Sequence, residues 1–170
     1  VRGGIAAEPV LGSVATDVLT GLGPAPLAKD MRLALADHAR EWPALTVAPV
    51  AELEAEPVLR VLAGPRDDWF TPQALETLCG VRWQVSSSSN RVGVRLEGPK
   101  LERTRTDELA SEGMLAGALQ VPPSGQPILL LADHPTTGGY PVIAVVDPAD
   151  LRHVAQAAPG TALRFRPFGR

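Results

Sequence analysis

Cysteine is almost missing from this sequence, since Cys79 is the single one among 170 residues. One thiol cannot form an internal disulfide, and it offers no second cysteine for the paired ligands of a structural zinc site. The three histidines are not clustered either. The sequence therefore predicts no disulfide and no metal site, and it favours a reducing compartment, the cytoplasm.

A strong excess of charge and a long apolar run are also lacking. Sixteen Lys and Arg residues stand against 19 Asp and Glu residues, for a formal net charge of −3. Such a chain has no general attraction for phosphate backbones or anionic lipid. No stretch approaches the roughly 20 apolar residues of a transmembrane helix. We therefore expect neither nucleic acid nor a membrane as the partner.

Glycine and proline, in contrast, are plentiful, with 16 and 17 residues. They stand between short apolar runs and do not gather in one tract, which is typical of folds with many short strands. We therefore expect an all-β fold, rich in strands and with two short helices.

The distribution of glycine and proline also predicts how the chain is divided into domains. Residues 1–35 are expected to form strands and turns that complete a structure begun upstream. Residues 36–57 lose clear periodicity and contain three prolines, so they are expected to be a linker. Residues 58–170 then form the larger domain.

Within the larger domain, a helix is expected to begin at Pro72, with Thr71 as its N-cap, and to end before Gly80. A second short helix is expected between Asp147 and Pro159. Residues 97–120 are expected to be a long charged loop. Strands are expected over residues 58–63, 83–85, 91–96 and 162–167, and in the continuous apolar runs PILLLA and VIAVV, which should be buried on both faces.

Several long motifs resemble one known family. They are VLGSVATDVLTGLGPAPL, GPRDDWFTPQALETL, SSSSNRVGVRLEGP and SEGMLAGALQVPPSGQPILLLADHPTTGGYPVIAVV, and they span nearly the whole chain. The string ADHPTTGGYP is the most specific part. In these motifs the sequence is similar to the family of 5-oxoprolinase C-subunits, also described as allophanate hydrolase subunit 2 or as a biotin-dependent carboxyltransferase-like subunit.

The resemblance implies a fold of two cyclophilin-like β-barrels. Residues 1–35 would be the end of the first barrel and residues 58–170 the second, so the chain would be the C-terminal portion of a protein about twice as long. The resemblance also implies ATP as a cofactor of the complex, biotin as a second candidate cofactor, and subunit 1 of the same complex, a KipI-like protein, as the partner.

Two arginines are candidates for binding an acidic substrate. Arg91, Gly93 and Arg95 alternate in an expected strand and so share one face. Guanidinium groups bind carboxylates or phosphates in pairs of charge-assisted hydrogen bonds, and a bare glycine between them would leave room for the ligand. The spacing alone fits a solvated face with an Arg95 and Glu97 pair equally well. The resemblance favours the binding role.

The segment HPTTGGYP is a candidate for stabilising negative charge. It offers the hydroxyls of Thr136 and Thr137, the amides of Gly138 and Gly139, and the phenol of Tyr140. Such donors suit the oxygen that becomes anionic in carboxyl transfer from biotin or in the opening of an amide. The alternative is a tight connection whose glycines only supply positive φ.

Candidates for proton transfer lie on both sides of that segment. Asp133 is expected at the end of a buried strand, where partial desolvation would suit a general acid or base, although it also suits a turn. Glu112 is a second candidate base, and the Gln120 amide could bind a ureido or amide group, unless both only tie down a loop. We assign Asp133, Glu112 and Tyr140 to catalysis, and not His134, whose geometry is restricted by the following proline.

We therefore predict a subunit of an ATP-dependent hydrolase that opens an amide, or transfers a carboxyl group, on a small amide- or urea-derived acid such as 5-oxoproline or allophanate. It would be active only with its partner. The sequence has no G-x-S-x-G elbow and no P-loop, so any ATP site is unconventional or lies on the partner. The alternative is a regulatory module that antagonises a histidine-kinase inhibitor; isomerase activity would rest on fold analogy alone.

Overall fold

The computed structural model describes residues 1–17, 20–38, 41–42, 47 and 52–169. The chain divides into two compact units, Val1–Val50 and Ala51–Arg170. The division falls inside the segment 36–57, which was expected to be a linker. The three-part domain organisation itself stays a prediction.

The first unit has no strand among its described residues. It is held by isolated bridges, such as the one between Ile5 and Leu35, and by turns. The strands expected in residues 1–35 are therefore wrong for the described part of this unit. Positive φ angles recur at short intervals here, and each one interrupts an extended run; they occur at Gly3, Gly4, Leu11, Gly12, Gly21, Gly23 and Asp30. The origin of this segment in a preceding barrel stays a prediction.

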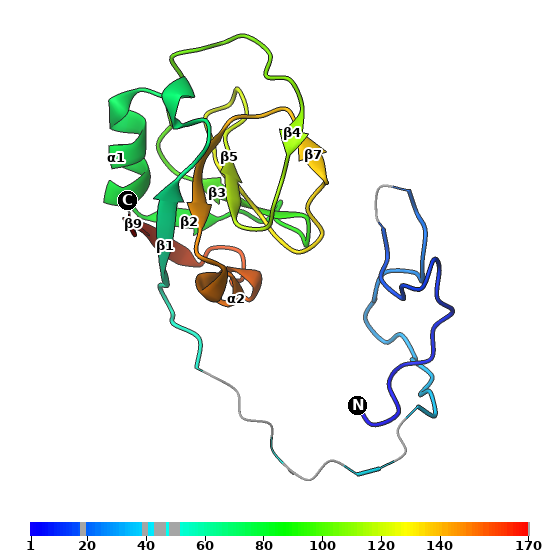
Figure 1. Cartoon of the computed structure of the whole chain (residues 1–170). Helices are drawn as coiled ribbons and strands as arrows, with labels where there is room; N and C mark the ends of the chain where they lie inside the picture. The colour runs from blue at the N-terminus through cyan, green and yellow to red at the C-terminus, as the bar shows by residue number, and fades with distance from the viewer. Residues whose placement is uncertain (18–19, 39–40, 43–46, 48–51, 170) are drawn as a thin grey trace. The chain divides into compact units, whose positions relative to one another are not determined.

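The second unit is a closed β-barrel, as Figure 1 shows. Its strands are β1 (Val58–Ala63), β2 (Trp83–Val85), β3 (Gly93–Glu97), β5 (Ala118–Gln120), β6 (Ile128–Leu130), β8 (Val142–Val146) and β9 (Ala162–Pro167). Their order around the barrel is β1-β8-β5-β6-β3-β2-β9. The parallel pair of β9 with β1 closes it, and the other pairs are antiparallel. The β-rich fold with two short helices is thus confirmed.

Alternating side chains fill the barrel. In β1, for example, Leu59 and Val61 are buried, whereas Val58 and Leu62 are exposed, because successive side chains of a strand point to opposite faces. The fully buried side chains include Leu59, Trp83, Leu96, Leu119, Leu129, Ile143 and Leu163.

The two continuous apolar strands, β6 and β8, are buried on both faces, as expected. Leu129 and Ile143 point into the barrel core. Leu130 and Val142 instead belong to a second small cluster, with Ala118 and the partly buried Met114. The segment that carries Met114 therefore covers the outer face of these strands, which removes any need for polar residues there.

Four short helical elements complete the unit: η1 (Asp67–Trp69), α1 (Pro72–Gly80), η2 (Pro148–Asp150) and α2 (Leu151–Ala155). Helix α1 begins at Pro72 as predicted, but the Thr71 side chain makes no capping hydrogen bond. The Trp83 Nε1 donates to the Leu78 carbonyl at 2.9 Å, which joins this helix to the barrel core. Helix α2 ends at Ala155, before the expected limit at Pro159.

Residues 97–120 are not a simple loop, which corrects the expectation. They contain β4 (Glu112–Gly113) and β5. Strand β4 pairs with β7 (Thr137–Gly138), which lies in the segment expected to be only a connection. These strands are two or three residues long, so their local sequence has no clear period, and they exist because distant partners complete them.

An arginine clamp ties β1 to the start of α2. The Arg60 guanidinium donates to both Asp150 oxygens at 2.9 Å and lies 3.1 Å from Asp147. The Asp150 carboxylate also accepts from the Arg60 backbone N–H at 2.8 Å. The side-chain hydrogen bond from Arg60 is the main cause that lowers the pKa of Asp150 below its ordinary value.

Replacing this carboxylate should lower stability in a pH-dependent way. Because the pKa of Asp150 is lower in the folded protein than in the unfolded chain, its contribution is complete above the unfolded value of about 4 and is lost as the pH falls through the folded value. Asp150→Asn should reduce the free energy of unfolding by about 1 to 2 kcal/mol at pH 7. Urea unfolding from pH 7 to pH 3 should show this deficit shrinking, whereas Glu102→Gln, at an exposed acid, should change little. A deficit that is constant with pH would contradict the clamp.

Candidate functional site

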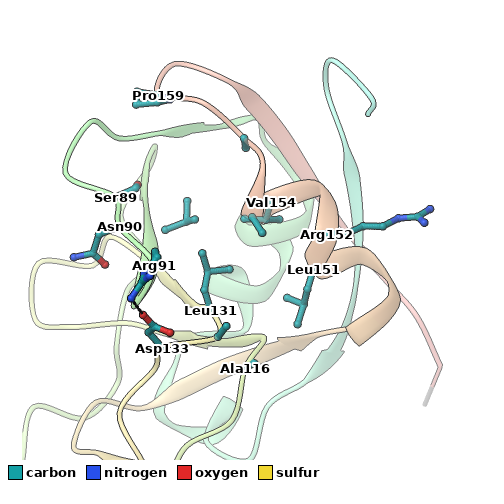
Figure 2. Close-up of a pocket in the computed structure, with 14 residues that line it drawn as sticks. Ser89, Asn90, Arg91, Ala116, Leu131, Asp133, Leu151, Arg152, Val154 and Pro159 are labelled. Atoms are coloured by element: carbon teal, nitrogen blue, oxygen red, sulfur yellow. Dashed lines mark ion pairs between the residues drawn. The ribbon is translucent and has the colours of Figure 1, made fainter. Parts of the chain in front are cut away.

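A pocket of about 570 Å³ opens between the start of β3, the residues after β6, and α2. Most of its lining is apolar: Val94, Leu131, Leu151 and Val154 come from these three parts of the barrel. Figure 2 shows Leu131, Leu151 and Val154, with Arg91 and Asp133 together at one side of the pocket. The pocket therefore combines an apolar wall with one pair of charged groups.

The charged pair joins two residues that the sequence predicted separately. The Arg91 guanidinium lies 2.6 Å from the Asp133 carboxylate, and the Asp133 N–H donates to the Arg91 carbonyl at 3.2 Å. The Asp133 side chain is 44% exposed, and the catalytic role expected for it stays a prediction. The pair presents a cation and a carboxylate side by side to the same pocket.

Arg95 is not part of this pocket, and the shared strand face expected for the two arginines is not formed, because Arg91 precedes β3. It lines a separate, smaller hollow with Ser88 and Glu97. The room expected beside Gly93 is also missing, since a Cβ at that glycine would lie 3.0 Å from the Ile128 side chain. Side chains of β6 occupy this space, so the two arginines do not flank one ligand slot.

The glycine-rich segment is organised by the β4–β7 sheet. Gly138 is paired with Glu112 and Thr137 with Gly113, and the Thr136 carbonyl accepts from the Met114 N–H at 2.9 Å. The main chain at these positions is therefore used for strand pairing. The sequence had suggested that Gly138 and Gly139 offer their amides to a ligand, and only Gly138 lies in this pairing.

The side chain of Gln120 packs against the β4–β7 sheet. The residue is only 6% exposed, and its Nε2 donates to the Met114 sulfur at 3.2 Å and to the Tyr140 carbonyl at 3.5 Å. A Cβ at Gly138 would lie 2.5 Å from that nitrogen. The buried amide thus packs against Gly138, and a side chain at that position would force the Gln120 amide to shift.

Glu112 is held by Arg66, a residue that the sequence did not single out. The Arg66 Nε donates to both carboxylate oxygens, at 2.9 and 3.1 Å, and its terminal nitrogen also contacts Glu112. The hydrogen bond from Arg66 lowers the pKa of Glu112 below its ordinary value, against a smaller effect of burial. A carboxylate so held is a weak base. Arg66 directly follows a Gly-Pro turn after β1. This position was the only feature of the sequence that could have identified Arg66 as a site residue.

The hydroxyl groups of the segment remain accessible. Thr136 and Thr137 are exposed, Gly139 is exposed, and Tyr140 is 45% exposed. The His134 Nδ1 lies 2.8 Å from the neighbouring Pro135 carbonyl, a local contact. The structure therefore leaves the three hydroxyls as candidate donors without assigning them a ligand.

No group of three or more His, Cys, Asp or Glu side chains in the described part of the chain could hold a metal ion. None of the helices there has the length and apolar character needed to cross a membrane.

Comparison with known proteins identifies the family. Residues 1–167 match the family described as "Carboxyltransferase domain, subdomain A and B". The chain belongs to this carboxyltransferase family. The resemblance found in the sequence motifs is thereby confirmed.

Relatives of this carboxyltransferase chain include subunits of known enzymes. The C-subunit of 5-oxoprolinase from Escherichia coli (strain K12) is 41% identical over 168 residues, which cover 97% of this chain and 54% of the relative. The crystal structure of TTHA0988 matches with a TM-score of 0.76 and 38% identity, over 96% of this chain and 31% of that one. The K. lactis urea amidolyase matches with a TM-score of 0.71 and 25% identity, over 99% of this chain and 12% of that one. The chain thus spans about half the length of the E. coli relative.

The packing of Gly138 on Gln120 can be tested within this carboxyltransferase barrel. Gly138→Ala places a methyl group 2.5 Å from the buried Gln120 amide, so the free energy of unfolding should fall by about 1 to 3 kcal/mol. Gly113→Ala is the matched control, because that glycine lies in the paired strand with nothing within 4 Å of its added Cβ. Equal effects of both substitutions in urea unfolding would refute the contact.

Proposed function

We propose that this chain is part of a subunit of an ATP-dependent enzyme that processes a small amide- or urea-derived acid, 5-oxoproline or allophanate. The observation that carries the proposal is the 41% identity to the 5-oxoprolinase C-subunit over 97% of the chain. The similarity to a urea amidolyase over 99% of the chain supports the same class of substrate.

The pocket at Arg91 and Asp133 suits such a substrate. A cavity of about 570 Å³ lies within the range of about 300 to 1,000 Å³ that is usual for small-molecule sites. Arg91 can bind a substrate carboxylate, since its guanidinium carries five N–H donors and its side chain is 62% exposed. Asp133 can accept a hydrogen bond from a neighbouring amide N–H. The apolar wall formed by Leu131 and Val154 would contact methylene groups and exclude water.

Roles within the site follow from these contacts. Asp133 is the carboxylate best placed to accept or return a proton, and Arg91 is the group that orients the acid. The hydroxyls of Thr136, Thr137 and Tyr140 are the remaining candidates for donation to an anionic oxygen. Glu112 is not proposed as a base, because Arg66 lowers its pKa.

The chain's residues do not fit a cofactor well. ATP sites need several donors around the phosphates, but the described residues contain no P-loop, and Arg66 is held by Glu112. The amide of Gln120, which the sequence suggested for the ureido group of biotin, is bound to Met114 and Tyr140. We therefore propose that ATP binds elsewhere in the complex, and no step here depends on biotin.

A partner subunit belongs to the proposal, because the E. coli relative is itself named as one subunit of its enzyme. The site would then be composite, with the cofactor chemistry supplied from outside this chain, in the cytoplasm. None of the relatives described above is named as a regulator of a kinase inhibitor, so we do not pursue the regulatory alternative.

The proposal is tested by ATP consumption of the full-length protein, purified with its partner subunit. Addition of 5-oxoproline, allophanate or urea in turn should stimulate turnover with one of the first two. A well-folded complex that responds to none of them would refute the proposed function.

Two substitutions then test the pocket. Arg91→Gln should lower kcat/KM by about 10- to 100-fold, the effect of one charge-assisted hydrogen bond. Asp133→Asn should lower kcat, because an amide cannot take up a proton. Lys100→Gln, which removes an exposed cation outside the pocket lining, is the control and should retain wild-type turnover. Full activity in both pocket variants would place the reaction elsewhere without affecting the family assignment.

A further inference from the structure

A second hollow, of about 190 Å³, lies beside the serine-rich turn between β2 and β3. That turn, Ser86–Asn90, contributes to both cavities, since Ser89 and Asn90 line the larger pocket. The lining of the small hollow is mixed, because polar side chains stand there among Leu96, Pro122, Pro127 and Ile128. Its polar lining consists of Ser86, Ser88, Arg95, Glu97, Ser124 and Gln126.

Hydrogen bonds hold the walls of this hollow in place. The Arg95 N–H donates to the Ser89 hydroxyl at 3.0 Å, and the Arg95 carbonyl accepts from the Ser86 N–H at 2.9 Å. On the facing loop, the Gln126 amide accepts from the Gly98 N–H at 3.0 Å and donates to its carbonyl at 2.9 Å. The hollow is therefore formed before any ligand arrives, which lowers the entropic cost of binding.

Two opposite charges face this hollow without pairing. Arg95 and Glu97 are two residues apart on β3 and share its exposed face, so their Cα atoms lie about 6.6 Å apart. Neither side chain forms an ion pair with any residue that the structure describes. Arg82, the other cation near Glu97, is bound to Glu56. Within the described residues, a cation and an anion without ion-pair partners thus stand at two positions of one small, rigid cavity.

We infer that this hollow binds a small dipolar molecule that carries a carboxylate and, a few bonds away, an ammonium or amide N–H. The carboxylate binds the Arg95 guanidinium, and the N–H group donates to Glu97. The hydroxyls of Ser88 and Ser124 can hydrogen-bond to either end of the ligand, since each hydroxyl both donates and accepts. The volume of about 190 Å³ is below the range of about 300 to 1,000 Å³ for larger ligands, so the site takes amino-acid-sized molecules.

This inference does not rest on the proposed function, because the hollow is separate from the larger pocket. A simple anion site makes a different prediction. Glu97 would then repel the ligand, and its neutralisation would strengthen binding. In a dipolar site the same change removes a partner of the ligand and weakens binding. The sign of the Glu97 effect therefore decides between the two.

The test compares β-alanine with propionate, which has the same carbon chain and carboxylate but no ammonium group. Binding to the full-length protein is measured by calorimetry and by amide chemical shifts. β-Alanine should bind at least about tenfold more tightly than propionate, with shifts at Ser88, Glu97 and Ser124. Glu97→Gln should abolish this preference, and Arg95→Gln should weaken both probes about tenfold or more.

Arg166→Gln is the matched control, because Arg166 is another exposed arginine of a barrel strand and does not line the hollow. It should leave both affinities unchanged. Tighter binding of either probe by Glu97→Gln, no saturable binding of β-alanine, or shifts confined to Arg91 and Asp133 would each overturn the inference. Since the assay measures binding and not turnover, its failure is distinct from failure of the proposed reaction.

Discussion

The pairing of β1 with β9 closes the barrel, and the rest of the larger unit depends on this closure. Val58 pairs with Arg164 and Val61 with Pro167, so strands from the two ends of the unit lie side by side. A barrel without this pair would expose two strand edges and the core between them. On its other side β1 pairs with β8, which brings it to the residues that follow β8, where Arg60 binds Asp150. The helix that forms one wall of the larger pocket is held in place by that clamp.

Charge pairing then decides which predicted residues are free to act. Arg66 holds Glu112, so a candidate base becomes an anchor of the β4–β7 sheet. Arg91 holds Asp133, but this pair stays partly exposed beside the larger pocket and can exchange partners with a substrate. Arg95 and Glu97 line the small hollow and have no ion-pair partner in the described part of the chain. The three arrangements involve the same residue types, and the difference between them lies in which oppositely charged side chain comes within reach.

Much of the fold was predictable because its signals are local. Strands β1 and β2 have the predicted bounds, and helix α1 begins at the predicted proline, since alternation, a turn and a proline act within a few residues. Strands β4 and β7 were missed because two residues carry no period, and β5 because its three residues are all buried and do not alternate. The candidate site was predicted only as a set of residue types. Arg91 and Asp133 were both identified, but their contact, the separation of Arg95 from them and the part played by Arg66 were not.

The sequence alone determined the family, through the long motifs around ADHPTTGGYP, and the fold class, through short apolar runs separated by glycine and proline. Periodicity and turn chemistry depend on neighbours along the chain, so they can be read without coordinates. Only the tertiary structure decided that Gln120 is buried beneath Gly138, that Glu112 is paired, and that Arg91 and Arg95 face different cavities. These outcomes depend on contacts between residues far apart in the chain, whose positions are set by barrel closure and by the register of its strands.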